Sequence, residues 1–566
     1  MFFGVVFVFV GLAVFVPRRN EEASRKALRW AARLAGKKAL VIALLFLTVI
    51  CIRIALLPLL RIPVPGIHDE YSYLMMADTF VHGRLANPPH PMWISFESFQ
   101  INWSPTYSSK YPPGQGAVLA LGQVLWHPWA GVVLSVAAMS AAILWMLQAW
   151  VPARWALLGG VVVALKFGIA SYWMNSYWGG AVAATGGALV LGAMPRIARH
   201  ARLLDALWLG LGLAILANTR PYEGLLFCIP VGAWFLWWLA GKTKSSTPPR
   251  TRAACVLPLA GVLVVTIAFM GYYNKRLTEN ALLFPHVLNA RTYRTAGLFL
   301  WDHSKPPASY NNDEFVKFYT GWEHQQYRRN WHDVLAVTAL KIVRMGPEFF
   351  WPGAVLLLPG LLFGLRDRRM RLPAIALVMC LAGVFLVIWS APHYAAPVTC
   401  VLVLLLVQAI RHLRLMRVAR RPIGLALSWA AVCLLTLDVG AAAAKHRCDP
   451  LEWTCKGDPS RQVVEDKLSN TPGKHLILVR YAKNHNIHDE WVYNGADIDG
   501  AKVLWARELG GEQDEKLFAY FKDRRIWLVE PDVDNTKIKP YSPPETMVRS
   551  ARFASPDKSQ RNAAIK

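Results

Sequence analysis

The strongest constraint on this chain is a series of long apolar runs that carry almost no charge. Apolar residues make up 54% of its 566 residues. A helix of about 20 such residues crosses the hydrocarbon core of a bilayer. The runs lie at residues 39–60, 129–150, 153–173, 178–195, 204–218, 223–240, 253–273, 349–364, 373–390, 393–410 and 422–443. The sequence therefore predicts a mainly α-helical, polytopic membrane protein with eleven transmembrane helices.

The first 38 residues form a separate N-terminal region. Residues 1–16 are apolar and lead into Pro17-Arg18-Arg19 without a small-residue cleavage site. We interpret them as an uncleaved anchor or a twelfth span rather than a signal peptide. Residues 20–38 combine basic and apolar residues at helical spacing, which predicts an amphipathic helix on the cytoplasmic leaflet. The alternative for this stretch is a solvated charged linker.

The net charge of +26 is compatible with nucleic-acid binding, but the distribution of the basic residues argues against it. The bases cluster in short loops between apolar runs, where the positive-inside rule places them. With eleven spans, every cluster falls on the same side as residues 17–38. These clusters are Arg196/Arg199/Arg202, Lys242/Lys244/Arg250/Arg252, Arg366/Arg368/Arg369/Arg371 and Arg411/Arg414/Arg417/Arg420/Arg421. We therefore predict an inner (plasma) membrane protein that does not bind nucleic acid.

This predicted membrane topology places the polar and aromatic loops on the extracytoplasmic face. The membrane domain spans residues 39–444, with extracytoplasmic loops at 61–128 and 274–348 and a short interfacial helix at 115–126. A transporter would more often carry polar residues at the bilayer midplane. Here Lys166 and Asp438 are the main ionisable residues inside the spans. This pattern favours a reaction centre at the extracytoplasmic surface over a transport path.

After the last span the composition becomes that of a soluble module. The patterns of residues 475–481 and 525–530 predict buried strands, and the pattern around 512–522 between them predicts a helix. We predict a small extracytoplasmic α/β domain over residues 445–534 and a disordered polar tail over 535–566. Cys448 and Cys455 would form a local disulfide if this side is oxidising.

The tripeptide His68-Asp69-Glu70 follows the first long span and carries the candidate catalytic acids. A carboxylate at the apolar–aqueous boundary is partly desolvated, which raises its basicity and suits it to take a proton from an alcohol. The alternatives are a hydrated interfacial acid or a helix cap. Residues 487–490 repeat the same Ile-His-Asp-Glu sequence as residues 67–70. We favour the first copy because it adjoins the membrane and the basic candidates.

Lys110 and Arg220 are the candidate phosphate-binding residues, since each lies where a predicted helix meets the extracytoplasmic surface. Arg suits bidentate phosphate binding, and Lys acts as a compact point charge. The alternative is snorkelling, in which long basic side chains at span ends reach for water. Pro221 fixes the turn after Arg220, and Glu223 is its candidate ion-pair partner.

Aromatic side chains complete the candidate substrate site, because sugar faces stack on aromatic rings. Tyr111, Tyr177, His393 and Tyr394 lie at the predicted extracytoplasmic ends of spans or loops. The 274–348 loop adds further aromatic residues together with Arg291, Arg294, Arg328, Arg329, Glu323 and His324. An interfacial aromatic belt has the same composition, so both interpretations stay open here.

These motifs resemble those of the GT-C glycosyltransferases. The Asp69-Glu70 pair after the first long span is similar to the Asp-Glu of that superfamily, whose first extracytoplasmic loop carries a catalytic carboxylate. Ser109-Lys110-Tyr111-Pro112-Pro113 resembles the Lys-Pro-Pro element of the aminoarabinose and protein O-mannosyl transferase branch, whose lysine contacts the lipid-linked phosphate. Tyr111 departs from the commoner spacing, and Arg220 has no motif match.

The resemblance implies an inverting transfer from a polyprenyl-phosphate sugar to an extracytoplasmic glycan, lipid or protein. Asp69 would be the base, with Glu70 as its neighbour and Lys110 as a phosphate contact. Some relatives use a divalent metal, but one acid pair plus His68 offers too few ligands to assign one. The alternatives are a flippase or exporter of lipid-linked sugars and a non-catalytic membrane scaffold.

Overall fold

The computed structural model describes residues 31–243, 247–327, 331–445 and 459–541, together with residues 4, 8 and 29. Nearly all of the predicted N-terminal anchor and most of the predicted amphipathic helix lie outside these residues. So do Cys448, Cys455 and the last part of the tail. The predictions for those segments therefore stay predictions.

The chain divides into two compact units, which are described separately. The helical unit contains residues 1–88 and 100–457, and the C-terminal unit contains residues 89–99 and 458–566. This division differs from the predicted boundaries, because residues 89–99 of the predicted first loop belong to the C-terminal unit. Within this segment, Phe96 is fully buried and its ring contacts Phe521 of that unit.

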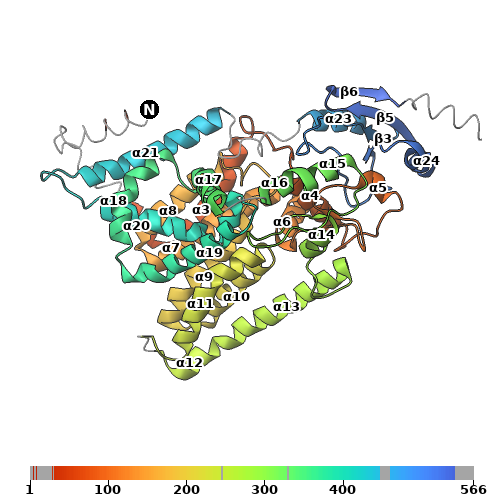
Figure 1. The fold of residues 1–566 in the computed structure, drawn as a ribbon. Helices are drawn as coiled ribbons and strands as arrows, with labels where there is room; N and C mark the ends of the chain where they lie inside the picture. The colour runs from red at the N-terminus through yellow and green to blue at the C-terminus, as the bar shows by residue number, and fades with distance from the viewer. Residues whose placement is uncertain are drawn as a thin grey trace, which may run out of the picture. The chain divides into compact units, whose positions relative to one another are not determined.

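Each of the eleven predicted apolar runs coincides with helix, which confirms the mainly helical fold class (Figure 1). The corresponding helices are α3 (Lys38–Ala55), α7 (Pro128–Trp150), α8 (Ala153–Gly168), α9 (Ala181–His200), α10 (Leu203–Ala217), α11 (Pro221–Leu239) and α13 (Val256–Thr278), which follows the short α12 (Pro249–Ala254). They continue with α18 (Leu358–Gly364), α19 (Arg371–Leu386), α20 (Thr399–Leu413) and α21 (Ile423–Ala444).

Fewer of these helices are long enough to cross a bilayer than the sequence predicts. Within the described residues, eight are long and apolar enough, or nine if the bent pair 334–349 and 352–364 forms one span. Helices α8 and α10 have only 16 and 15 residues, and at about 1.5 Å per residue they fall short of a hydrocarbon core of about 30 Å. The protein is a multi-pass membrane protein.

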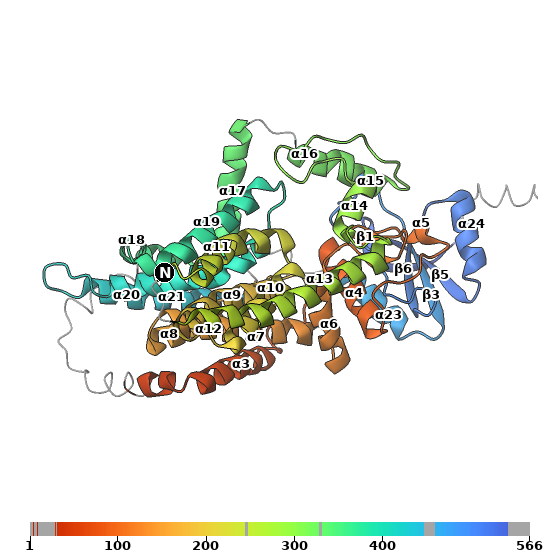
Figure 2. The same cartoon turned by 90° about the horizontal axis from the view of Figure 1, so that it is seen from below.

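The centre of the helical unit is formed by α7, α9 and α20. In the most apolar stretch of α7, 72% of the residues are buried within the protein, and in the span that ends with α20 the share is 89%. By contrast, only 11% is buried in the span formed by α12 and α13. Helix α13 lies along the lower edge of this unit in Figure 1 and in front of its other helices in the view from below in Figure 2, and several of its apolar side chains are exposed. These exposed side chains suit contact with lipid.

The predicted first loop is an ordered structure that supports the candidate site. It contains α4 (His68–Val81), the paired strands β1 (Ile101–Asn102) and β2 (Ser108–Ser109), and α6 (Pro113–Leu125). Helix α6 packs closely on α7 because Gly122 and Gly131 have no side chains to separate them. Val124, Leu125 and Trp126 are more than 60% exposed at the end of α6, which fits the predicted interfacial helix.

The predicted 274–348 loop is shorter than expected. Helix α13 continues to Thr278, and α17 (Trp331–Phe349) occupies the other end of the predicted loop. Between them lie α14 (Pro285–Tyr293), α15 (Asp313–Val316), the π-helix Lys317–Trp322 and α16 (Glu323–Tyr327). Helix α17 combines charged and apolar residues, so its pattern does not show as an uninterrupted apolar run.

The C-terminal unit is an α/β domain, as the sequence predicts (Figure 1). Its strands are β3 (Lys474–Val479), β4 (Val503–Arg507), β5 (Arg524–Glu530) and β6 (Asp534–Pro540), in the spatial order β4-β3-β5-β6. Strands β4, β3 and β5 are parallel, and β6 is antiparallel to β5. Helices α5 (Trp93–Phe96), α23 (Pro459–Ser469) and α24 (Gly511–Tyr520) belong to the same unit.

Strand β6 corrects the predicted start of the disordered tail. Residues 535–540 were expected to be disordered because they are polar and rich in lysine. Instead they pair with the free edge of β5, where backbone hydrogen bonds do not require apolar side chains. Most of the β6 side chains are exposed, which is typical of a charged edge strand.

Candidate active site

Asp69 lies in the first turn of α4 and accepts a hydrogen bond from the hydroxyl of Tyr111. The ring of Tyr111 stacks on Tyr73, with 4.5 Å between the ring centroids. Tyr73 lies four residues after Asp69, so both side chains are on one face of α4. The N-terminus of a helix also favours a carboxylate, because its backbone N–H groups carry partial positive charge.

Lys110 and Arg220 both act electrostatically on Asp69, and the segment after Lys110 packs on the turn before Arg220. The backbone N–H of Gly114 donates to the carbonyl of Asn218 at 2.8 Å. A Cβ atom at Gly114 would lie 2.4 Å from a side-chain carbon of Thr219, so only glycine permits this approach. The glycine after the two prolines therefore joins the segment that follows Lys110 to the turn that precedes Arg220.

The three charged residues interact electrostatically. Burial raises the pKa of the Asp69 carboxyl, while the nearby charges of Lys110 and Arg220 and the Tyr111 hydrogen bond oppose that rise. Burial lowers the pKa of Lys110 to about 8, with Asp69 opposing this shift. Asp69, Lys110, Tyr111 and Arg220 all remain partly exposed. The group thus combines a base of raised basicity with two accessible cations.

Glu70 has a different environment from Asp69, although the two residues are adjacent. One oxygen of its carboxylate accepts the backbone N–H groups of Gly66 (2.9 Å) and Ile67 (3.3 Å). The other oxygen accepts the backbone N–H of Tyr177 at 2.9 Å. Glu70 is fully buried, and burial raises its pKa to about 7 against these hydrogen bonds. Its contacts therefore fix the chain around Asp69.

Tyr177, a predicted substrate contact, is also buried in the protein framework. Its hydroxyl donates to the carbonyl of Pro63 at 2.8 Å, and its own carbonyl accepts from Gln115 at 2.8 Å. Only 2% of Tyr177 is exposed. The backbone of Tyr177 thus connects Glu70 on one side with α6 on the other.

Two further predicted substrate contacts lie beside Arg220. The guanidinium of Arg220 lies 4.5 Å from the centre of the Tyr394 ring, within the range of a cation–π interaction. Tyr394 is partly exposed, and its electrostatic interactions include Asp69. Glu223, in the first turn of α11, is buried and interacts electrostatically with Arg220. Arg220 is therefore held between a ring and a carboxylate.

The two predicted histidines have mainly apolar surroundings. His393 is 1% exposed, and its ring contacts Trp178 with 4.5 Å between the centroids. Its Nδ1 lies 2.9 Å from the Tyr172 hydroxyl oxygen, and its backbone N–H donates to the same oxygen at 3.0 Å. His68 is buried with its ring against Phe318 at 5.8 Å. Neither contact places a histidine on the Asp69 carboxylate.

The structure adds an ion pair from the second loop to this group. Arg294 donates to Glu323 at 2.8 Å, and both side chains are largely buried. Both residues also interact electrostatically with Lys110. The sequence offered them only as two of several charged residues in an aromatic loop. Arg294 and Glu323 are 29 positions apart in the sequence, and only the fold brings them together. Their pairing therefore could not be predicted from the sequence.

No metal site is evident in the described part of the chain. It contains no group of three or more His, Cys, Asp or Glu side chains that could hold a metal ion. Near Asp69, the second predicted acid is already engaged by backbone N–H groups. The donor set at Asp69 therefore does not fit a resident divalent metal, and we assign no step to one.

The second Ile-His-Asp-Glu copy has a structural role in the C-terminal unit. Glu490 forms a buried ion pair with Arg507 and accepts the Tyr481 hydroxyl at 2.5 Å. It also accepts the backbone N–H of Val492 at 2.9 Å. With its carboxylate used in this way, Glu490 stabilises the domain rather than offering a free acid.

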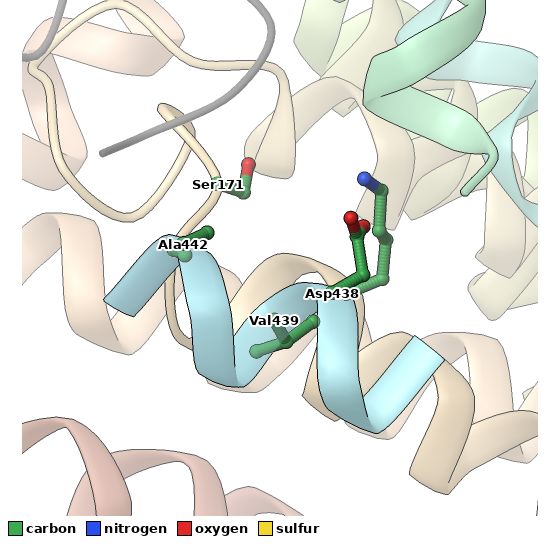
Figure 3. Close-up of a pocket in the computed structure, with 6 residues that line it drawn as sticks. Ser171, Asp438, Val439 and Ala442 are labelled. Carbon is green, nitrogen blue, oxygen red and sulfur yellow. The ribbon is translucent and has the colours of Figure 1, made fainter. Parts of the chain in front are cut away.

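The two charged residues inside the predicted spans line a separate small cavity (Figure 3). Asp438 on α21 and Ser171 point into this cavity in Figure 3, and Lys166 on α8 also lines it. Ser171 donates at 2.5 Å to the fully buried Glu348. None of the residues that line this cavity is among the candidate site residues around Asp69.

Comparisons with known proteins found structural likeness only. No family model and no curated protein sequence matches the chain. The crystal structure of apo ArnT from Cupriavidus metallidurans is 14% identical, covers 91% of this chain and 95% of its own, and has a TM-score of 0.48. ArnT from the same organism bound to undecaprenyl phosphate gives 13% identity, coverage of 88% and 93%, and a TM-score of 0.46.

The apo oligosaccharyltransferase of Archaeoglobus fulgidus is 12% identical, with a TM-score of 0.45. The alignment covers 78% of this chain but only 62% of the archaeal protein. The archaeal protein is an oligosaccharyltransferase, and ArnT has been crystallised with undecaprenyl phosphate bound. TM-scores below 0.5 do not by themselves assign an activity to this chain.

Proposed function

We propose that this protein is a membrane glycosyltransferase that moves a sugar from a polyprenyl-phosphate donor to an acceptor hydroxyl. The observation that carries the proposal is the convergence of Asp69, Lys110 and Arg220. A partly desolvated carboxylate beside two accessible cations suits a reaction that removes a proton and releases a phosphate. Two features support it further, the motif resemblance at Asp69-Glu70 and Lys110, and the multi-pass architecture.

In the proposed reaction, Asp69 takes the proton of the acceptor hydroxyl as the oxygen attacks the anomeric carbon. The bond from that carbon to the phosphate oxygen breaks, and the electron pair leaves with the lipid phosphate. The anomeric configuration inverts because attack and departure occur on opposite faces. Asp69 afterwards releases its proton to water. A phosphate leaves readily, so the step needs charge stabilisation rather than a general acid.

Lys110 and Arg220 are the proposed phosphate contacts. Arg suits bidentate contact with phosphate oxygens, and Lys supplies a point charge. Glu223 and Tyr394 hold the Arg220 side chain, while Tyr73 and Tyr111 form an aromatic wall beside Asp69. Tyr111 also orients the carboxylate, and burial raises its own pKa well above the usual range, so it stays a proton donor.

We further propose that this site and the C-terminal domain face the extracytoplasmic side of the inner membrane. The support is the basic loops, which all fall on one side if the two shorter apolar helices, α8 and α10, also pass through the membrane. Single cysteines at exposed positions in a cysteine-free variant, such as Val81 and Leu282, should react with a membrane-impermeant thiol reagent in intact cells. A cysteine at Leu415, in a basic cluster, should react only after lysis. The reverse pattern would contradict the proposed orientation.

The activity can be tested with purified protein in lipid nanodiscs and radiolabelled polyprenyl-phosphate sugars. A transferase releases free polyprenyl phosphate and labels an acceptor glycan, lipid or protein. A flippase, the alternative in the same lipid chemistry, moves labelled donor across liposomes and leaves the sugar–phosphate bond intact. Movement of intact donor without bond cleavage would contradict the transferase proposal.

A further inference from the structure

A chain of hydroxyl hydrogen bonds ties α4 to the segment 109–111. The hydroxyl of Ser72 donates to the carbonyl of Gln100 at 2.8 Å. The hydroxyl oxygens of Ser72 and Ser109 lie 2.7 Å apart. Because the single proton of Ser72 goes to Gln100, Ser109 is the donor in this pair. Ser109 in turn accepts the backbone N–H of Tyr111 at 3.2 Å.

The carbonyl of Gln100 also holds the backbone of Lys110, whose N–H donates to it at 3.2 Å. Ser72 and Ser109 are 0% and 2% exposed, so water does not compete for these hydrogen bonds. Gln100 itself has a φ of 65°, a left-handed conformation that is uncommon for a residue other than glycine. The surrounding contacts therefore fix an otherwise unfavourable backbone at this point.

The residue before Gln100 belongs to the C-terminal unit. Residues 89–99 form part of that unit, and the fully buried Phe96 contacts Phe521 with 6.0 Å between the ring centroids. The hydroxyl of Ser98 lies 2.6 Å from the carbonyl of Val492, which it can reach as a donor. One peptide bond therefore connects a segment embedded in the C-terminal unit with the residue that holds Lys110.

His90 anchors the other end of this segment in the same unit. Its ring stacks on Phe521 at 5.8 Å between centroids, with edge contacts to Tyr520 and Phe96 at 5.1 and 5.2 Å. Its Nδ1 accepts the backbone N–H of Met92 at 3.0 Å. The proton therefore resides on Nε2, which lies 3.3 Å from a carboxylate oxygen of Asp499.

We propose that Ser72 and the Gln100 carbonyl position Lys110 relative to Asp69, and that the C-terminal unit anchors them through residues 89–99. This inference rests on the proposed transferase function, in which Lys110 holds the donor phosphate while Asp69 takes the acceptor proton. Ser72 is three residues after Asp69 on the same helix, so its hydrogen bonds fix both partners from one element. Ser72 is a positioning residue and does not itself contact substrate.

Ser72→Ala tests the first part, with Ser140→Ala as the matched control. Ser140 is equally buried in the helical unit, but its hydroxyl donates only to Val136 of its own helix, at 2.8 Å. We expect Ser72→Ala to lower kcat/KM for the donor by about 10²-fold, the size expected for a small misplacement of a binding group. Ser140→Ala should change kcat/KM less than about threefold.

The pH profile separates positioning from general destabilisation. Lys110 opposes the burial-driven rise in the pKa of Asp69, so a displaced Lys110 lets that pKa rise further. The acid limb of kcat/KM should then move to higher pH in Ser72→Ala but not in Ser140→Ala. Of the other groups whose charges act on Asp69, Arg220, Tyr73, Tyr394 and Glu70 lie outside the segment 109–111. Tyr111 lies within it, and a weakened Tyr111 hydrogen bond would move the pKa of Asp69 in the same direction.

His90→Ala tests the second part, with Val464→Ala as a control in the same unit. Val464 is fully buried in the apolar core of that unit. We expect His90→Ala to shift the acid limb of the kcat/KM profile to higher pH, as Ser72→Ala does. Val464→Ala should lower the thermal stability of the protein but leave the acid limb at the wild-type pH. A wild-type profile for Ser72→Ala would overturn the positioning role. A wild-type profile for His90→Ala would overturn the anchoring role of the C-terminal unit.

These outcomes are distinct from failure of the proposed function. If wild-type protein transfers no sugar, the transferase proposal itself fails. If wild-type protein is active and Asp69→Asn is inactive, but Ser72→Ala and His90→Ala behave like their controls, only the positioning proposal fails.

Discussion

The hydroxyl of Tyr111 donates a hydrogen bond to the carboxylate of Asp69. Tyr111 follows directly after Lys110, so this bond brings the candidate base and a candidate phosphate ligand from two segments into one site. Electrostatic interactions with Arg220 from a third segment complete the group. The arrangement is what distinguishes the cations here from basic side chains that only reach for water at the ends of spans.

We expect kcat/KM for the donor to fall at alkaline pH because Lys110 loses its charge there. Burial lowers its pKa to about 8, so its ammonium loses a proton as pH rises through that value. The phosphate then loses a charged partner, and kcat/KM for the donor should fall above about pH 8. Lys110→Arg keeps its charge throughout this range and should remove the alkaline fall, although its geometry differs.

A suitable control for this profile is Lys275→Arg, because Lys275 is exposed at the end of α13. It should keep the wild-type profile. If Lys110→Arg retained the alkaline fall, the group that titrates there would not be Lys110.

Arg220 should contribute through its planar shape as well as its charge. Arg220→Lys keeps the charge but loses the bidentate fork and the stacking on Tyr394. We expect the KM for the donor to rise by about 10- to 10²-fold, the size of one or two hydrogen bonds to a charged group. Arg202→Lys, in an exposed basic cluster, is the control. Equal effects of the two variants would support simple snorkelling instead.

Glu70 should affect stability more than chemistry. Glu70→Ala leaves three backbone N–H groups without their acceptor, and each such loss costs about 1–3 kcal/mol in a buried site. We expect a fall of several degrees in the Tm of the purified protein in detergent. Glu512→Ala, at an exposed position in the C-terminal unit, should leave Tm unchanged. An unchanged Tm in Glu70→Ala would contradict the framework role.

The same carboxylate predicts a pH dependence of stability. Burial raises the pKa of Glu70 to about 7 in the folded protein, above its usual value of 4.5. Between these values the folded state holds more protons than the unfolded state, so the Glu70 contribution to the free energy of unfolding falls as pH rises. Glu70→Gln should flatten the decline in Tm between about pH 4.5 and 7. An identical decline in the variant would mean that other groups cause it.

The apolar runs predicted the helices because burial in lipid demands uncharged residues over whole turns. The same reasoning overestimated the spans, since α8 and α10 are apolar but too short to cross alone. Strand β6 was missed for the opposite reason. It pairs through its backbone at the sheet edge, so its sequence shows no apolar alternation.

At the site, the sequence could indicate which residue types meet but not how each is used. Asp69 and Glu70 are adjacent, and the backbone N–H groups of Gly66, Ile67 and the distant Tyr177 distinguish the buried framework acid from the accessible one. Tyr73 and Ser72 could have been found from helical spacing, because they lie four and three residues after Asp69. Residues 89–99 could not, because their burial depends on a unit more than 350 positions away in the sequence.

The most direct test of the account is sugar transfer by Asp69→Asn, measured in nanodiscs with radiolabelled polyprenyl-phosphate sugar. The control is Asp78→Asn, on the same helix, whose carboxylate accepts from Gln123 at 3.0 Å. We predict that Asp69→Asn binds donor but transfers sugar about 10²–10⁴-fold more slowly, the usual loss for a general base. Asp78→Asn should keep most of its activity. Wild-type turnover in Asp69→Asn would contradict the proposed site.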